Sequence, residues 1–386
     1  MNICVITNGY PTPNDPGMFV FVDQLVTAWA DMGENVYVIC PLPYFVELRD
    51  KSRFYKDEWE KTTHKGNTIK IFSPRYFRFS DRKIGSINSQ RISYSHFQYV
   101  IKKIIRSIPE KIDVLYSHFL SAGCHAGDIG YEMNIPAFCA FGESVLWSIR
   151  GWDLKNVKRS LGKLSGIISV STENRRVLID NDLYKKEDIE VIPNGVDHKL
   201  FFKRDKIKIR EKYDFPEDAF IGAFTGTFTD AKGVLFAQEA AKKAKNVKMI
   251  FIGSGEQKPE GDNILFQGKL KHERIPEYLC AADFFILPTK AEGCCNAIIE
   301  AMACGLPIIS AEGAYNDDIL SDEYSIRTCP TDVDAMAQAI ERLKENPDLR
   351  DSMSRAAEEA SMRYDISKRA ALILDFLVKK GNRKDR

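Results

Sequence analysis

Short apolar runs alternate along the chain with segments whose apolar residues recur every three or four positions. The short runs are typical of buried parallel strands, and the longer segments are typical of helices packed on a sheet. The predicted strands are residues 3–7, 36–40, 113–117, 135–140, 167–171 and 190–192, followed by 219–225, 249–252, 264–267, 284–287 and 308–310. The main predicted helices are residues 19–32, 96–108, 234–245, 277–282, 296–304, 332–344, 349–360 and 366–380. This alternation predicts an α/β fold with two doubly wound, Rossmann-like parallel sheets facing across a cleft.

A chain of 386 residues is too long for one typical hydrophobic core, so two domains are expected. We predict an N-terminal domain over residues 1–195 and a C-terminal domain over residues 196–362. Residues 363–386 are predicted to form a terminal helix that crosses back to the first domain, followed by a basic tail.

The composition is that of an ordinary soluble protein, with 44% apolar residues, 28% charged residues and a formal net charge of +1. This balance argues against a general affinity for nucleic acid. No apolar segment reaches the roughly 18 residues of a membrane span, and the first residues do not resemble a signal peptide. The nine cysteines lie among apolar neighbours without metal-ligand spacing, which indicates a reducing compartment and no metal site. We therefore expect a cytoplasmic protein.

The stretch from Thr289 to Pro307 carries the most informative chemistry. It contains one predicted helix between two strands, with Gly305 placed to cap the C-terminal end of the helix. Glu292 precedes the helix in a loop, and Glu300 lies within it. Ligands of open α/β sheets bind at such loops, and the first turn of a helix favours a phosphate or a polyhydroxyl group. Two carboxylates indicate a partner rich in hydroxyl donors, such as a nucleotide sugar. The alternative is a solvated pair of glutamates.

Other predicted loops add to this site. Gly293 lets the backbone approach a ligand closely, and Gly253 opens a further glycine loop. Lys232 ends a loop over residues 226–233, directly before a helix, where its point charge suits a diphosphate. An ordinary surface lysine is the alternative. His118 stands at the carboxyl end of a predicted strand, where it either faces a ligand or belongs to the core.

Residues 65–106 are strongly basic, with ten Lys and Arg side chains against one acid, Asp81, and with interleaved aromatic residues. Within them, the helix predicted over residues 96–108 has one apolar side with basic residues beside it. Such a helix is typical of a surface that meets anionic lipid on a membrane. It is equally typical of a helix that packs its apolar side on the core and leaves a basic face in water. Nucleic acid fits less well, because the rest of the chain is not basic.

The stretch over residues 289–307 resembles, position by position, the signature of the retaining nucleotide-sugar glycosyltransferases of family 4. The shared positions are Glu292, Gly293, Asn296, Glu300 and the run that ends at Pro307. The resemblance implies the GT-B architecture, in which the second domain holds a nucleotide sugar and the first holds an acceptor. Neither a metal cluster nor paired carboxylates at glycosidase spacing stand out, which favours a metal-independent mechanism without a resident cofactor.

The resemblance assigns roles to residues of this chain. The catalytic candidates are Glu292, which would orient the donor sugar, Lys232, which would meet the phosphates, and His118 on the acceptor side. Glu300 would bind the ribose. The full set of donor-binding candidates is Gly17, Thr227, Lys232, Gly253, Gly268, Lys269, Leu270, Glu292, Gly293, Cys294, Cys295, Asn296 and Glu300.

The chain departs from the family pattern at two positions. Thr227 stands near the place of an arginine that pairs with the lysine, and Phe141 takes the place of a histidine near the donor sugar. Lys269 and Lys290 are candidates to replace the arginine. Glu143, two residues after Phe141, is the candidate to hold an acceptor hydroxyl beside His118.

These features predict a retaining hexosyltransferase that uses a UDP or GDP sugar and a saccharide acceptor. A lipid-linked acceptor in cell-surface polysaccharide biosynthesis fits the basic segment, which would place the protein at the inner face of the plasma membrane. Two alternatives remain open: a GT-B nucleotide-sugar 2-epimerase, and a catalytically silent partner subunit, which the residues Thr227 and Phe141 favour.

Overall fold

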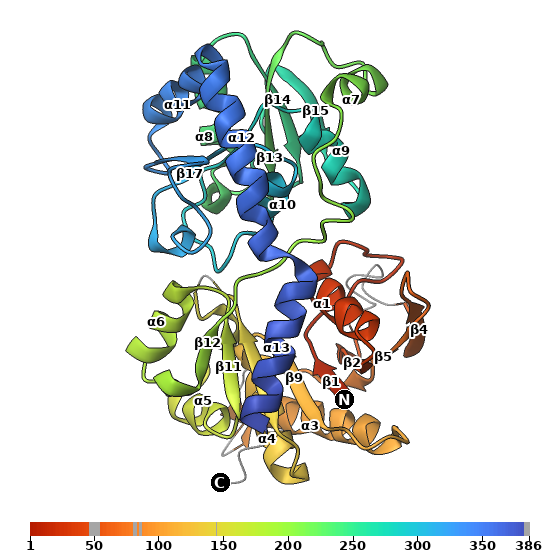
Figure 1. Ribbon diagram of the computed structural model, residues 1–386. Coiled ribbons are helices and arrows are strands. Elements are labelled where there is room, and N and C mark those ends of the chain that lie inside the picture. Colours follow the sequence, from red (N-terminus) through yellow and green to blue (C-terminus); the bar gives the residue numbers. More distant parts are fainter. Residues whose placement is uncertain (46–54, 80–82, 85–86, 144, 382–386) are drawn as a thin grey trace. The chain divides into compact units, whose positions relative to one another are not determined.

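The computed structural model describes residues 1–45, 55–79, 83–84, 87–143 and 145–381 (Figure 1). The chain divides into two compact units. Unit 1 comprises Met1–Ile192 and Arg369–Arg386, and unit 2 comprises Pro193–Lys368. Residues 193–195 belong to unit 2 because the backbone N–H of Asn194 donates to Cys294 Sγ at 3.3 Å. Asp365 is held there as well, through its bridge to Val196.

Unit 1 is built on an eight-stranded sheet whose neighbouring strands are parallel except at one edge. The order is β12 (Ile189–Val191), β11 (Gly166–Ser169), β10 (Ala137–Phe141), β9 (Val114–His118), β1 (Asn2–Ile6), β2 (Asn35–Ile39), β5 (Thr68–Phe72) and β4 (Glu58–Thr62). The edge strand β4 pairs antiparallel with β5. Two short pairs lie outside this sheet: β3 (Leu42–Pro43) with β6 (Arg75–Tyr76), and β7 (Lys83–Ile84) with β8 (Ile87–Asn88).

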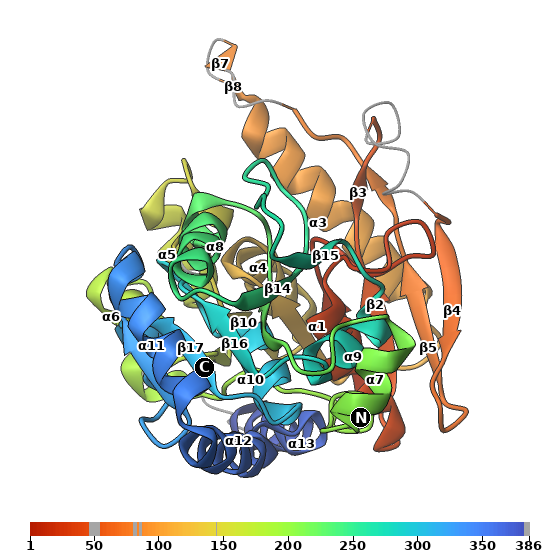
Figure 2. The same cartoon turned by 90° about the horizontal axis from the view of Figure 1, so that it is seen from above.

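The helices of unit 1 are α1 (Val20–Asp31), α3 (Ser89–Ser107), α4 (Leu120–Met133), α5 (Leu154–Leu161) and α6 (Thr172–Asp180). The sequence pattern did not predict α4, α5 or α6. Helix α4 was not predicted because it is rich in glycine, which has a low helix propensity and is typical of loops. These glycines allow close packing instead, since a Cβ on Gly130 would lie 2.6 Å from the carbonyl oxygen of Ile135. Figure 2 shows α4 between α3 and α5.

The apolar side predicted for residues 96–108 lies in the core of unit 1. Ile101 is fully buried, and Val100, Ile105 and Ile108 are nearly so. The interpretation that this side of α3 packs on the core is therefore correct. The interpretation that α3 lies on a membrane through the same side is wrong.

Helix α13 (Ile366–Gly381) packs on unit 1 over its later turns. The indole N–H of Trp29 donates to the carbonyl oxygen of Ala370 at 3.1 Å. The ring of Phe376 lies 5.8 Å from that of Phe138 between centroids, and Lys380 pairs with Asp188 at 2.6 Å. Within the described ranges, every helix is too short or too polar to cross a bilayer.

Unit 2 is built on a six-stranded, entirely parallel sheet. The order is β15 (Ile264–Gly268), β14 (Val247–Ile252), β13 (Phe220–Thr225), β16 (Phe284–Leu287), β17 (Ile308–Ala311) and β18 (Ser325–Thr328). Its helices are α7 (Lys206–Lys212), α8 (Val234–Lys243), α9 (Ile275–Cys280), α10 (Asn296–Ala303), α11 (Val333–Glu345) and α12 (Pro347–Ser361). Single 3-10 turns complete the chain at Trp147–Ile149, Lys186–Asp188, Asp230–Lys232, His272–Arg274, Ala314–Asn316 and Met362–Tyr364.

The predicted cap at the end of α10 is confirmed. Gly305 has a φ of +72°, its N–H donates to the carbonyl oxygen of Met302, and the N–H of Leu306 donates to that of Ala301. This paired pattern with a left-handed glycine ends a helix sharply and satisfies its last carbonyl groups. It fixes α10, and with it Glu300, between β16 and β17.

Candidate functional site

Two loops of unit 2 meet beyond the carboxyl ends of the neighbouring strands β13 and β16. The first runs over residues 226–233 and the second over residues 288–295, which lead into α10. The backbone N–H of Lys290 donates to the carbonyl oxygen of Ala231 at 2.9 Å. The ammonium group of Lys290 also pairs with Asp230 at 2.7 Å. These contacts hold the two loops together. The loops carry six of the thirteen predicted donor-site residues: Thr227, Lys232, Glu292, Gly293, Cys294 and Cys295.

The ion pair between Lys232 and Glu292 lies where these loops meet. Both side chains are mostly buried, with 27% of the lysine and 12% of the glutamate side chain exposed. Burial alone would lower the pKa of Lys232, but the carboxylate of Glu292 outweighs it and the pKa is raised. The lysine therefore stays charged, and its positive charge is directed at the carboxylate that the sequence assigned to the donor sugar.

A second pair joins Glu300 to His272. Glu300 on α10 is buried, and its Oε1 lies 3.0 Å from Nε2 of His272 in the turn after β15. Burial alone would lower the pKa of His272, but its hydrogen bond and charge attraction to Glu300 outweigh that effect and raise the pKa. The ring of His272 also packs on Phe201, at 5.1 Å between centroids. His272 was not predicted from the sequence, where its only signal was its place three residues after Lys269.

The glycines at the ends of β13 and β14 approach each other. Gly253 has a φ of +149°, and a Cβ there would overlap the carbonyl oxygen of Gly226. The N–H of Gly253 donates to the carbonyl oxygen of Gly268 at 2.8 Å, and Phe228 forms an isolated bridge with Gly255. Gly253 is thus required by the packing of the chain on itself. Next to Gly268, Lys269 is exposed and Leu270 is partly buried.

The residues before α10 pack tightly. Gly293, Cys294 and Cys295 are buried, and burial is the main reason that the pKa of the Cys295 thiol is raised. The side-chain oxygen of Asn296 is buried and lacks a hydrogen-bond partner among the described residues. No side chain caps the first turn of α10, so this end of the helix can accept an anion or hydroxyl groups.

Unit 2 offers no simple replacement for the arginine that the family pattern places near Thr227. Thr227 is exposed. Lys290 already pairs with Asp230 and lies 5.1 Å above the ring of Phe236. Lys269 is the candidate cation that forms no ion pair with a described residue, so it stays a prediction for this role.

The acceptor-side candidates of unit 1 are held in a different way. His118 is 3% exposed and lies against the rings of Phe21 and Tyr116, at 5.5 and 5.2 Å between centroids. Burial lowers its pKa to about 3, and the charge of Arg369 adds to this effect. His118 is therefore neutral near pH 7. Its Nε2 has no hydrogen-bond partner in the described part of the chain.

Glu143 is buried, and its carboxylate accepts hydrogen bonds from neutral donors. The N–H of Leu120 at 3.0 Å belongs to the first turn of α4, and Ser148 donates its N–H at 2.9 Å and its hydroxyl at 2.5 Å. Burial raises the pKa of Glu143, and these bonds offset part of that rise. The carboxylate ties α4 to residues 143–148, and its role toward an acceptor stays a prediction.

Two further predicted positions of unit 1 differ in exposure. Phe141 is fully buried in the core, so its ring does not replace the hydrogen bonds of a histidine. Gly17 is exposed, and a Cβ there would meet nothing within 4 Å. Its close approach to a ligand stays a prediction. Among the described side chains, no three His, Cys, Asp or Glu residues form a group that could hold a metal ion.

Comparison with known proteins identifies the family of both units. Residues 17–200 match the family described as "Glycosyltransferase Family 4", and residues 205–360 match "Glycosyl transferases group 1". Together the two matches span most of the chain.

Two curated relatives share about a quarter of their residues with this chain. One is the putative teichuronic acid biosynthesis glycosyltransferase TuaC of Bacillus subtilis, 24% identical over 387 residues, with 96% of each chain covered. The other is the UDP-Gal:alpha-D-GlcNAc-diphosphoundecaprenol alpha-1,3-galactosyltransferase of Escherichia coli. It is 25% identical over 300 residues, which are 70% of this chain and 76% of that protein.

A solved structure shares the fold over nearly the whole chain. HepE of Anabaena in complex with UDP matches with a TM-score of 0.71 and 16% identity, and the match covers 98% of this chain and 100% of HepE. The predicted α/β fold class is confirmed by this likeness and by the two sheets, which are parallel apart from the edge strand β4. The chain belongs to the family 4, group 1 glycosyltransferases of the GT-B fold.

Proposed function

We propose that this glycosyltransferase moves a sugar from a nucleoside diphosphate sugar to a saccharide acceptor, with retention of anomeric configuration. The nucleotide is UDP or GDP, and the acceptor is a lipid-linked saccharide in the assembly of a cell-surface polysaccharide. The names of the two relatives support this class of product and acceptor. The UDP in HepE supports UDP as the first nucleotide to test.

The observation that carries the proposal is the ion pair of Lys232 with Glu292 beside the uncapped start of α10. A diphosphate that approaches this point competes with Glu292 for the lysine. Once the ammonium group turns to phosphate, the Glu292 carboxylate is free to accept hydrogen bonds from sugar hydroxyls. The same donor thereby satisfies both members of the pair.

Glu300 and His272 supply the second half of the donor site. A carboxylate can accept two hydrogen bonds from a vicinal diol, and the diol would take the place of His272, whose Nε2 lies 3.0 Å from Oε1 of Glu300. In the proposed reaction, charge develops on the departing diphosphate. Lys232 and the first-turn N–H groups of α10 stabilise that charge, so the rate depends on positioning and electrostatics. The step is proposed to need neither a metal ion nor a resident cofactor.

Calorimetry and product analysis test the proposal directly. The protein is titrated with UDP and GDP, and then incubated with a panel of nucleotide sugars and lipid-linked saccharides. Mass spectrometry identifies the transferred sugar, and NMR of the product gives its anomeric configuration. We expect one nucleotide to bind and a product whose configuration matches that of the donor. An inverted product would contradict retention.

The same measurements separate the two alternatives. Failure of both nucleotides to bind would favour a silent partner subunit, for which Thr227 and the buried Phe141 remain the motivating positions. Turnover of a nucleotide sugar without any acceptor would favour a 2-epimerase. Transfer to an acceptor would exclude both.

A strip of exposed aromatic rings in unit 1 supports a membrane-bound acceptor. The ring of Phe77 stacks on that of Tyr44 at 4.5 Å and lies 6.2 Å from that of Phe79. His96 continues the strip at 5.2 Å from Phe77, and Tyr99 follows at 6.0 Å from His96. Phe77, Phe79 and Tyr99 are all exposed. Exposed aromatic rings beside basic residues such as Arg78 and Lys103 suit the interface of an anionic membrane. The aromatic strip thus replaces the apolar side of α3 as the proposed contact.

Vesicle flotation tests the aromatic strip. We expect salt-sensitive binding to vesicles that contain anionic lipid, and at least about tenfold weaker binding after F77S/F79S. The matched control is Tyr131→Ser, because Tyr131 is an exposed aromatic residue on α4, outside the strip. Equal binding of both variants would remove the strip as a membrane contact while leaving the transfer reaction untouched.

A further inference from the structure

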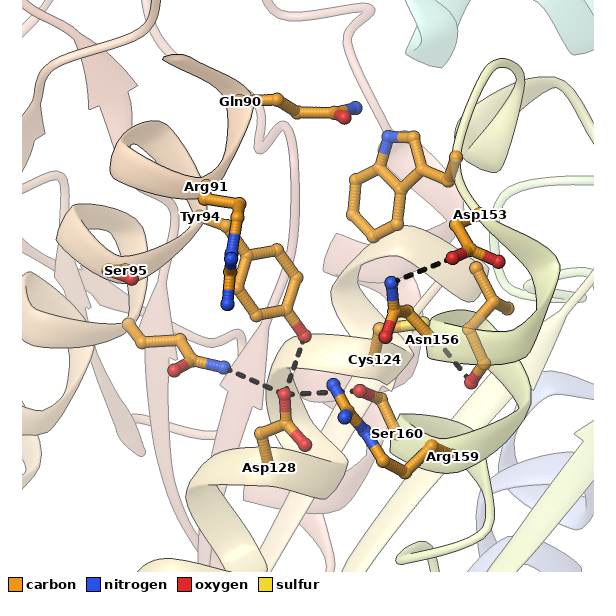
Figure 3. Close-up of a pocket in the computed structure, with 13 residues that line it drawn as sticks. Gln90, Arg91, Tyr94, Ser95, Cys124, Asp128, Asp153, Asn156, Arg159 and Ser160 are labelled. Carbon is orange, nitrogen blue, oxygen red and sulfur yellow. Dashed lines mark hydrogen bonds between the residues drawn. The ribbon is translucent and has the colours of Figure 1, made fainter. Parts of the chain in front are cut away.

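A cavity of about 730 Å³ lies in the helix layer of unit 1, whereas the donor-site candidates other than Gly17 belong to unit 2. Figure 3 shows its labelled lining. Gln90, Arg91 and Tyr94 come from α3, Cys124 and Asp128 from α4, and Asn156, Arg159 and Ser160 from α5. The cavity has the size of a small-molecule site, and its lining combines rings, amides and charges. None of the residues proposed for nucleotide binding or transfer lines it.

Aromatic rings form the apolar part of the lining. Tyr94 and Trp152 meet edge to face, with 5.7 Å between ring centroids. Tyr94 also stacks on the buried ring of His125 at 4.0 Å, which fixes its orientation. Tyr and Trp rings offer an apolar face beside a polar edge. This combination suits a sugar ring, which has C–H groups on its faces and hydroxyl groups at its rim.

The acid of α4 does not oppose a negatively charged ligand. Asp128 pairs with Lys163 at 2.6 Å and accepts hydrogen bonds from Tyr94 at 2.7 Å and from Ser160 at 3.1 Å. Burial alone would raise the pKa of Asp128, but these partners outweigh it and the pKa is lowered. The carboxylate is thus fixed and neutralised by the lysine. Asp153, also in the lining, caps the first turn of α5.

Two arginines of the lining form no ion pair with a described acidic residue. Across the part of the chain that the structure describes, no carboxylate lies within ion-pair distance of Arg91 or Arg159. Both are exposed, one on α3 and one on α5, on either side of the cavity (Figure 3). A guanidinium group binds a carboxylate or a phosphate through two parallel hydrogen bonds. The cavity therefore offers two cations beside two rings.

We infer that this cavity binds a sugar residue that carries an anionic group, either the carboxylate of a uronic acid or a phosphate ester. The sugar ring lies against Tyr94 and Trp152, and the anionic group is bound by Arg91 and Arg159. Within the proposed function, which this inference presupposes, the ligand is a charged residue of the acceptor saccharide. The cavity would thereby select acidic acceptors.

Binding measurements without a donor test this inference. The probes are a tetrasaccharide of alternating glucuronate and N-acetylglucosamine, the same tetrasaccharide with its carboxyl groups reduced to hydroxymethyl groups, glucose 1-phosphate and inorganic phosphate. We expect at least one of the two charged saccharides to bind at millimolar concentration or tighter. Its neutral counterpart, the reduced tetrasaccharide or glucose, should bind at least tenfold more weakly.

Matched variants locate the binding. R91Q/R159Q should weaken binding of the charged saccharide at least tenfold, which corresponds to about 1.4 kcal/mol. The control R106Q/K155Q removes two exposed cations from the same two helices, outside the cavity lining, and should leave binding unchanged. All four positions are exposed, so the folded state is expected to persist in both variants, and circular dichroism verifies it.

The outcomes distinguish a uronate ligand from a sugar phosphate. They also distinguish failure of the cavity inference from failure of the proposed function. Preference for the tetrasaccharide assigns the cavity to a uronate, and preference for glucose 1-phosphate assigns it to a sugar phosphate. The inference is overturned if inorganic phosphate binds as tightly as either charged saccharide, if the reduced tetrasaccharide binds equally, if no probe binds, or if R91Q/R159Q binds like the wild type. UDP titration of the same samples is independent of the cavity, so intact UDP binding with a failed cavity test would leave the proposed function standing.

Discussion

The titratable groups at the candidate sites of the two units are held in opposite ways. In unit 2, Lys232 pairs with Glu292 and His272 with Glu300, so each group faces one that a charged or hydroxylated ligand can replace. In unit 1, Glu143 accepts three hydrogen bonds from neutral donors. Withdrawing that carboxylate would leave buried donors unsatisfied, whereas an ion pair can exchange partners. Under the proposed function, the pairs of unit 2 would exchange partners with the donor, whereas Glu143 would hold the fold of unit 1.

The glycines of the two units differ in the opposite sense. Gly253 in unit 2 lies against the backbone of Gly226, while Gly17 in unit 1 faces open space. A glycine in contact with its own chain is required for the packing of the folded protein. A glycine without such contact has steric room for a ligand.

The largest expected effect is therefore on the stability of unit 2. The substitution Gly253→Ala places a Cβ on the carbonyl oxygen of Gly226 at a φ of +149°. Overlap and backbone strain together should lower the free energy of unfolding by about 4 kcal/mol. Urea denaturation measures this change in the free energy of unfolding.

Gly17→Ala is the matched control for that change, with an expected effect within about 0.5 kcal/mol. If Gly17→Ala keeps its stability and loses transfer activity, Gly17 contacts a substrate. A Gly253→Ala protein as stable as the wild type would contradict the packing that distinguishes the two glycines.

The next largest effect is expected in unit 1. Glu143→Ala removes the acceptor of three hydrogen bonds at the start of α4 and should destabilise the protein by about 3 kcal/mol. Glu143→Gln keeps one acceptor oxygen and should cost less. Thermal unfolding and UDP titration are the measurements, and UDP binding should survive in the folded fraction. A stable Glu143→Ala protein that has lost only its use of the acceptor would break the comparison, because it would make Glu143 a ligand of the acceptor.

Much of the fold could be predicted from the sequence because the buried parallel strands are short apolar runs. The strands β1, β9, β13 and β16 all lie within a few residues of the predicted ranges. The edge strand β4 was missed, since its residues alternate between exposed and partly buried positions and include two glutamates and a lysine. Helix α4 was missed because its glycines serve close packing, which no local pattern records.

The residues of the candidate site also fall into two groups, those that a contiguous motif contains and those that packing brings together. A contiguous signature carries Glu292, Asn296 and Glu300, so the sequence alone singled them out. The partner of Glu300 could not be found in that way, because His272 is brought to it by the turn after β15. The cavity of unit 1 draws most of its lining from three helices, two of them unpredicted, and the rest from Trp152 and Asp153 before α5, and no motif joins them. Pairings that depend on packing between distant segments therefore lie beyond what a single sequence reveals.

A smaller effect is expected on transfer. Lys232→Ala should lower kcat/KM about 30-fold, or roughly 2 kcal/mol, since a charged hydrogen bond to the diphosphate contributes about 1.5–3 kcal/mol. The control is Lys242→Ala, which removes a lysine from another ion pair, with Glu239 at 3.0 Å, near the far end of α8. Its rate should equal that of the wild type. Equal rates in both variants would show that the pair in the candidate site does not exchange with the donor.

The smallest effect is a pH dependence that belongs to unit 2. The pKa of His272 is raised in the folded protein, because the attraction of Glu300 outweighs burial. Its stabilising contribution should be fully present below the usual histidine value of about 6.5 and lost as pH rises through the folded value. His272→Gln should therefore cost about 1 kcal/mol at pH 5.5 and much less at pH 9. Thermal unfolding at the two pH values measures the difference.

His64 is the matched control for this pH dependence, because it is an exposed histidine of unit 1. His64→Gln should shift the melting temperature equally at pH 5.5 and pH 9. Bound UDP sharpens the test: if the ribose takes over Glu300, His272 loses its partner and its pKa falls toward or below the usual value. The stabilisation by UDP should then be weaker at pH 5.5 than at pH 8 in the wild type, and this difference should shrink in His272→Gln. A pH dependence of UDP binding that is identical in both proteins would mean that Glu300 keeps His272 and does not exchange it for the nucleotide.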